Sequence, residues 1–278
     1  MTTTGLLYQH WKKEQHIFSK NLAILKKHNE KEAVHDLRVS VKKLRAAIEL
    51  YVLLTKEPLW EYPLKETEKL FNISGKQRDL EISLEVLAEL EKETSKKYPE
   101  LKRNLQTSLS AAKKWTNIAI YEYNKKEPEA IAILIKEDKS SAIHEDLKYN
   151  LYSLITEHLV GCKNYFKKPH KLRQYLKEIY YWIKIAPENW DTITQNEKEI
   201  HSVLDDLGRW QDLEMLSIKA KHFRKDYLPK ILPENELIKN LQENILAKEQ
   251  ELLRAALSKT KEILKKVPRN EKEKTVSL

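Results

Sequence analysis

Glycine and cysteine are scarce in this chain, and their scarcity narrows both the fold and the chemistry. The 278 residues include four glycines and one cysteine. Glycine makes up about 7 % of average proteins, so this small number leaves few tight turns and disfavours a sheet-rich fold. The single cysteine, Cys162, excludes an intrachain disulfide and any multi-cysteine metal site, which suits a reducing cytoplasm.

Long apolar runs are also missing. No stretch approaches the roughly 18 consecutive apolar residues that suit a membrane span, and residues 1–25 carry charges without an apolar core. We therefore expect neither a membrane partner nor a secretion signal, and we expect a cytoplasmic protein.

Charge is abundant and unbalanced. Charged residues make up 33 % of the chain and hydrophobic residues 41 %, which is typical of a folded protein with a very polar surface. The formal net charge is +9 and the pI is about 9.2. A positive excess of this size indicates an anionic partner without identifying it.

Helical periodicity fills most of the sequence. Prolines and polar breaks divide it into about eight segments rich in Leu, Lys, Glu, Ala and Ile. We expect helices at roughly 5–27, 30–56, 58–93, 98–125, 129–161, 168–186, 190–226 and 233–267. The tail at 268–278 lacks periodicity and is expected to fray. The sequence predicts an all-α protein.

The two halves of the chain resemble each other. "HDLRVSVKKLRAAIEL" from His35 aligns without a gap to "HKLRQYLKEIYYWIKI" from His170, 135 positions later. "GKQRDLE" from Gly75 aligns with "GRWQDLE" from Gly208, 133 positions later. We expect two pseudo-symmetric repeats at about 5–127 and 128–267, each a four-helix bundle, packed as one compact body.

The repeated segment carries a row of cations along one side of a helix. At 100° per residue, an arc of about 80° contains His35, Arg38, Lys42 and Arg45. The acidic residues Asp36 and Glu49 are expected elsewhere on this helix. The second copy repeats the row with His170, Arg173 and Lys177, and has Tyr180 in place of Arg45.

Two interpretations of this row are open. A solvated amphipathic helix would place Lys and Arg outside simply because water is there. However, His, Arg and Lys recur at identical offsets, and like charges three and four residues apart repel each other. A bound polyanion would relieve that repulsion. The aspartates that follow the repeated glycines, Asp79 and Asp212, could orient neighbouring cations of the row.

These motifs resemble the CHAD family, the conserved histidine α-helical domain, over residues 5–265. The resemblance implies two four-helix bundles related by a pseudo-twofold axis, with a basic central channel that binds inorganic polyphosphate, and a possible association with polyphosphate granules. Carried over by position, the residues expected to bind polyphosphate are His35, Arg38, Lys42, Arg45, Arg78, His170, Arg173 and Lys177. Of these, Arg78 is expected near the rim, with Lys76 or Arg209. Gln211 stands opposite Arg78. The "ExExK" signature of the triphosphate-tunnel enzymes that accompany many relatives is absent from this sequence, so we expect a stand-alone binding module.

Two other functions compete with this one. RNA binding would require base-stacking aromatics on the basic face, where we expect Tyr180 alone, with Tyr181 and Trp182 turned away. A metal-dependent phosphohydrolase could use the His35–Asp36 dipeptide, but the second copy does not repeat the aspartate. His201 and Asp205 could chelate a metal, yet a solvated pair is the simpler reading. We expect no cofactor, no metal and no catalysis; other polyanions could also bind.

Overall fold

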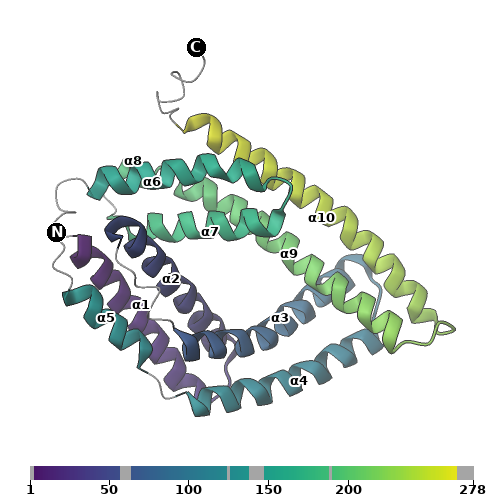
Figure 1. Ribbon diagram of the computed structural model, residues 1–278. Coiled ribbons are helices and arrows are strands. Elements are labelled where there is room, and N and C mark those ends of the chain that lie inside the picture. Colours follow the sequence, from purple (N-terminus) through teal and green to yellow (C-terminus); the bar gives the residue numbers. More distant parts are fainter. Residues whose placement is uncertain (1–2, 57–63, 124–125, 138–146, 188–189, 268–278) are drawn as a thin grey trace.

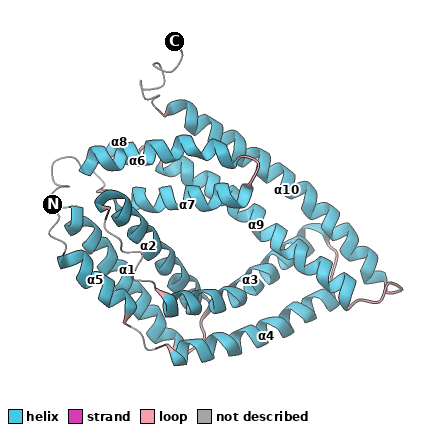
Figure 2. Ribbon diagram, viewed as in Figure 1, coloured by secondary structure: helices cyan, strands magenta, loops and turns pink. Residues whose placement is uncertain are grey.

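The computed structural model describes residues 3–56, 64–123, 126–137, 147–187 and 190–267, and none of these lies in a strand. The expected all-α class is confirmed (Figure 2). The helices are α1 Thr3–Leu25, α2 Lys31–Thr55, α3 Lys65–Thr94, α4 Pro99–Glu122, α5 Glu127–Glu137, α6 Leu147–Gly161, α7 Pro169–Ile185, α8 Asp191–Thr194, α9 Glu197–Asp226 and α10 Pro233–Lys266, with a 3₁₀ turn at Cys162–Tyr165.

Two of the expected segments are divided. The segment expected at 129–161 contains two helices, because α5 packs against α1 whereas α6 packs against α7. Residues 138–146, which would have joined them, lie outside the described residues. The segment expected at 190–226 becomes α8 and α9, separated by a turn at residues 195–196. The expected helical residues 58–63 and 124–125 and the expected frayed tail at 268–278 also lie outside the described residues.

Four helices form an inner ring. α2 contacts α3, α3 contacts α9, α9 contacts α7, and α7 contacts α2 (Figure 1). An outer helix covers each of them: α1 on α2, α4 on α3, α10 on α9 and α6 on α7. The two helices that carry the repeated basic rows, α2 and α7, are therefore neighbours.

Regularly spaced apolar residues explain why α2 and α7 pack as they do. Each helix buries one stripe at spacings of three and four residues, which comprises Val34, Leu37, Val41 and Leu44 in α2 and Leu172, Leu176, Ile179 and Ile183 in α7. The buried Trp182 indole of α7 also donates a hydrogen bond of 3.0 Å to the Ala46 carbonyl of α2. Burial of these stripes fixes where the remaining faces point.

The hydrophobic core is not divided between the two halves. One cluster joins Leu44 of α2 to Leu176 of α7 and Ala256 of α10. A second joins Leu87 of α3 to Leu241 of α10. The third draws only on the first half of the chain. Among the described residues, each cluster that contains buried apolar side chains of the second half therefore also contains side chains of the first half.

Two carboxylates from distant segments satisfy the first turns of α3 and α4. Glu127 accepts hydrogen bonds from the Glu66 and Thr67 backbone amides at 3.1 and 3.0 Å. Glu234 accepts from Glu100 and Leu101, each at 3.1 Å. Helix N-termini have unpaired N–H groups and a positive dipole end, so a buried carboxylate stabilises them.

Replacement of Glu234 by alanine should therefore lower stability. The side chain is buried, and its loss leaves two backbone amides without a partner, which costs about 1–3 kcal/mol. Thermal unfolding should show a midpoint lower by roughly 2–12 °C, at about 2–4 °C per kcal/mol. Glu236→Ala is the matched control, because Glu236 lies in the same turn but is exposed. Equal effects of the two substitutions would contradict this capping role.

None of the described helices is both long enough and apolar enough to cross a membrane.

Candidate functional site

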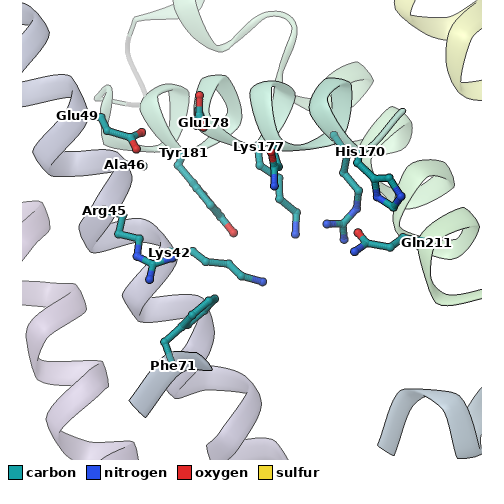
Figure 3. Close-up of a pocket in the computed structure, with 12 residues that line it drawn as sticks. Lys42, Arg45, Ala46, Glu49, Phe71, His170, Lys177, Glu178, Tyr181 and Gln211 are labelled. Atoms are coloured by element: carbon teal, nitrogen blue, oxygen red, sulfur yellow. The ribbon is translucent and has the colours of Figure 1, made fainter. Parts of the chain in front are cut away.

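A cavity of about 480 Å³ lies between α2 and α7. Phe71 of α3 and Gln211 of α9 complete its wall, so all four helices of the inner ring contribute (Figure 3). The side chains that line it are Lys42, Arg45, Ala46, Glu49, Phe71, His170, Arg173, Gln174, Lys177, Glu178, Tyr181 and Gln211. The structure thus brings together five of the eight residues that the sequence nominated.

The α2 cations gather around one aromatic ring. The guanidinium carbons of Arg38 and Arg45 lie 4.1 and 4.4 Å from the Phe71 ring centroid. The Lys42 Nζ lies 5.8 Å from it. Arg38 also donates a hydrogen bond to the Phe71 carbonyl. The negative face of an aromatic ring attracts cations, so Phe71 holds this row in place while other N–H groups stay available.

The rows on α2 and α7 act on each other electrostatically. Burial, together with the positive charges of Lys42, Arg173 and Arg38, lowers the pKa of Lys177 to about 6. Burial likewise lowers the pKa of Lys42 to about 8, assisted by Arg38 and by Arg173 from the facing helix. The two lysine side chains extend from their helices into the space between them (Figure 3). Cations from both halves therefore share one cavity.

Each repeated glycine makes room for an arginine of the row. A Cβ at Gly75 would lie 2.8 Å from Arg38 Nη1, and a Cβ at Gly208 would lie 3.5 Å from Arg173 Nη2. Both glycines are helical, so close approach rather than an unusual backbone angle explains them. The repeat seen in the sequence thus corresponds to a repeated contact between an arginine and a glycine.

The aspartates that follow the glycines act on the same arginines. Burial lowers the pKa of Arg38 to about 10, and the Asp79 carboxylate opposes this. Burial also lowers the pKa of Arg173, and Asp212 opposes it. In both halves, therefore, the aspartate acts electrostatically on the arginine that it was expected to orient.

The two histidines of the repeat occupy different surroundings. His170 lines the cavity, pairs with Glu214 at 2.9 Å and packs on Trp210 with ring centroids 4.7 Å apart. His35 is exposed and lies one turn before Arg38, outside the cavity. Partial burial by its neighbours nevertheless lowers the pKa of His35, and the positive charge of Arg78 adds to the effect.

Two of the three cations expected at the rim, Arg78 and Arg209, are paired with carboxylates. Arg78 lies 3.7 Å from Glu81 and 3.9 Å from Glu85. Arg209 forms an ion pair with Glu89. Lys76 is exposed. Arg78 nevertheless remains within the electrostatic range of Arg38 and His35, so its charge reaches the first row.

A second cavity of about 400 Å³ adjoins the first and shares Arg173, Lys177 and Tyr181 with it. α9 forms its far wall with Gly208, Arg209 and Asp212 among others.

The expectation that Tyr181 turns away from the basic face is wrong. Tyr181 lies four residues after Lys177, about 40° further round the helix, and therefore stays on the same side.

The expectation for Glu49 is also wrong. Glu49 follows Arg45 by four residues, which returns it to the basic side of α2, and it lines the cavity. Sequence reasoning missed Glu178 and Phe71 as well. The four-residue spacing between Arg45 and Glu49 in the sequence already indicates that both lie on one side of the helix. Phe71 belongs to α3, and no pattern in α2 or α7 indicates it.

The metal-binding alternative gains no third ligand. His201 Nδ1 and Asp205 Oδ2 are 2.9 Å apart on an exposed part of α9. Among the residues that the structure describes, there is no group of three or more His, Cys, Asp or Glu side chains arranged to hold a metal ion.

Comparison with known proteins now identifies the family. Residues 15–220 match the family model of the CHAD domain. The crystal structure of the CHAD domain from the plant Ricinus communis matches with a TM-score of 0.72 at 15 % identity, over 94 % of this chain and 92 % of that one. PptA from Streptomyces chartreusis matches with a TM-score of 0.69 at 15 % identity, over 96 % of this chain and 100 % of that one. At this identity the two likenesses show the fold alone, and a search of the curated proteins found no match. Because the family model covers well over half of the 278 residues, the chain belongs to the CHAD domain family.

Proposed function

We propose that this CHAD-domain protein binds inorganic polyphosphate in the cavity between α2 and α7 and does not hydrolyse it. The observation that carries the proposal is the crowding of Lys42, Lys177 and Arg173 into one cavity. There Lys42 and Arg173 lower the pKa of Lys177, and Arg173 lowers the pKa of Lys42. Basic side chains outnumber the carboxylates that line this cavity, so the ligand-free site favours a dense anion.

The chemistry of polyphosphate fits this cavity. Its repeating unit offers oxygens and negative charge without bases or sugars, so recognition requires only spaced cations and N–H donors. Arginine can grip two oxygens at once, whereas lysine supplies a compact charge. Arg38 and Arg173 would provide the paired contacts, and Lys42 and Lys177 would act between them.

We further propose that the bound chain threads a basic channel between two pseudo-symmetric repeats of a single domain. His170 lines the cavity, and His35 and Arg78 would meet the polyanion where it leaves. The repeated contacts of Arg38 with Gly75 and Arg173 with Gly208 support this symmetry. The cytoplasm, including polyphosphate granules, is the proposed location.

Calorimetric titration against polyphosphate, tRNA and ATP at equal phosphate concentration tests the proposal. Polyphosphate should bind most tightly at physiological salt. The logarithm of the association constant should fall with the logarithm of salt concentration with a slope of about −2 to −4, as expected for three to five contacts with a single-stranded polyanion.

Two results would contradict the proposal. Tighter binding of tRNA would favour the nucleic-acid function instead. Release of orthophosphate from polyphosphate on addition of magnesium or manganese, absent with a protein lacking the cavity cations, would show catalysis.

A further inference from the structure

The lysines of the cavity face charged groups from every helix packed around them. Lys177 is influenced by Lys42 and Arg38 from α2, Asp212 from α9 and Arg173 from its own helix. Lys42 is influenced by Arg38 and Arg45 on its own helix, Asp79 from α3 and Arg173 from α7. In both sets the cations outnumber the carboxylates, so each lysine is held in surroundings that oppose its protonation.

The end of the cavity away from His170 carries two carboxylates, Glu49 of α2 and Glu178 of α7 (Figure 3). Burial raises the pKa of Glu49 to about 7, and the neighbouring Glu178 adds to the effect while Arg45 opposes it. Burial also raises the pKa of Glu178, opposed by Lys171. The cavity therefore contains one carboxyl group, Glu49, and two amino groups, Lys177 and Lys42, that exchange protons near neutral pH.

We propose that the cavity takes up protons together with the polyanion, so that acidification from roughly pH 8 to pH 6 tightens polyphosphate binding. This inference rests on the proposed function, and it adds a linkage between proton and ligand at the same site.

The sign of the linkage follows from the charges. Phosphate oxygens next to Lys177 and Lys42 favour the ammonium form, so binding raises the pKa of both lysines. The same negative charge disfavours a carboxylate, so binding also raises the pKa of Glu49. All three groups gain protons when the ligand enters. By linkage, affinity rises as pH falls, and it changes by up to about tenfold per pH unit for each proton taken up.

Calorimetry of the full chain with long-chain polyphosphate tests the linkage directly. The interior phosphates of a long chain are strong acids and keep their charge throughout this range. Titrations at one pH in buffers with small and large ionisation enthalpies should give different binding enthalpies, because protons are drawn from the buffer. The dissociation constant should fall by roughly tenfold or more between pH 8 and pH 6.

Two variants should change the linkage in a direction that a structural defect would not. Lys177→Arg fixes the positive charge, and Glu49→Gln removes the negative one. Each should tighten binding at pH 8 and flatten the pH dependence. A merely disruptive substitution would weaken binding at every pH. The exposed residues Lys230 and Glu243 supply matched controls, Lys230→Arg and Glu243→Gln, which should leave the profile unchanged.

His170 also lines the cavity and pairs with Glu214. The variant His170→Gln therefore measures how much of the proton uptake belongs to the His170 imidazole. Proton uptake that persists in this variant supports the inference, and uptake that disappears in it overturns the assignment to Lys177, Lys42 and Glu49. Binding with the same enthalpy in all buffers and no pH dependence would overturn the inference while leaving the proposed function intact. Absence of binding at every pH would overturn both.

Discussion

Replacement of Arg38 and Arg173 together by glutamate should reduce polyphosphate binding by about 10²- to 10⁴-fold. A hydrogen bond to a charged group contributes about 1.5–3 kcal/mol, and two such losses give a change of this size. The two arginines lie on facing helices, and each acts on Lys177 across or along the cavity. Reversal of both charges therefore affects the whole site rather than one contact.

The matched control for this variant is Arg103→Glu together with Arg254→Glu. It makes the same change in net charge, but Arg103 lies on α4 and Arg254 on α10, both exposed on outer helices (Figure 1). This control should bind nearly as well as the wild type. Circular dichroism should confirm that both variants are helical. A folded Arg38→Glu, Arg173→Glu protein with unchanged affinity would place the site elsewhere.

The two repeated glycines should respond differently to alanine. Gly208→Ala places a Cβ at ordinary contact distance, 3.5 Å from Arg173, and gains helix propensity of about 1 kcal/mol. Its unfolding midpoint should rise by about 2–4 °C with unchanged binding. Gly75→Ala places a Cβ 2.8 Å from Arg38, whose guanidinium is already held by the ring and carbonyl of Phe71. Gly75→Ala should therefore not raise the unfolding midpoint. It should weaken polyphosphate binding by about tenfold, the equivalent of one charge-assisted hydrogen bond.

A double-mutant cycle isolates the cause of this difference. If the Arg38 guanidinium is what opposes the new methyl group, Gly75→Ala should become as favourable as Gly208→Ala when Arg38 is alanine. The unfolding midpoints of the four proteins provide the measurement. No coupling between positions 38 and 75 would show that the arginine contact does not explain the glycine.

The helical class, most helix positions and the basic rows could be predicted from sequence because they depend on local periodicity. The apolar stripes of α2 and α7 have spacings of three and four residues, and their burial determines which faces remain for Arg38 and Arg173. The repeat of the two glycines is visible in the sequence, whereas their contacts are not. The arginine beside each glycine lies 37 residues earlier in the first half, at Arg38, and 35 residues earlier in the second, at Arg173.

Tertiary packing determined the parts that could not be predicted. Phe71 reaches the α2 cations from α3, and Glu178 acts on Glu49 from α7, so neither partner is visible in a single helix. The division between α5 and α6 likewise reflects the different helices on which they pack. His35 and His170 match in sequence, yet Glu214 and Trp210 give His170 partners that its copy does not share.

The shared hydrophobic clusters bear on where this chain can be shortened. The family match ends at residue 220, inside α9, yet α10 buries Ile238, Leu241 and Ile245 against the second half of α9 and the end of α3. A fragment that ends at residue 220 would lack α10, and the apolar side chains of α3 and α9 that pack against α10 would be exposed to water. A fragment meant to fold as a unit is therefore expected to need α10, which lies past the segment by which the family is recognised.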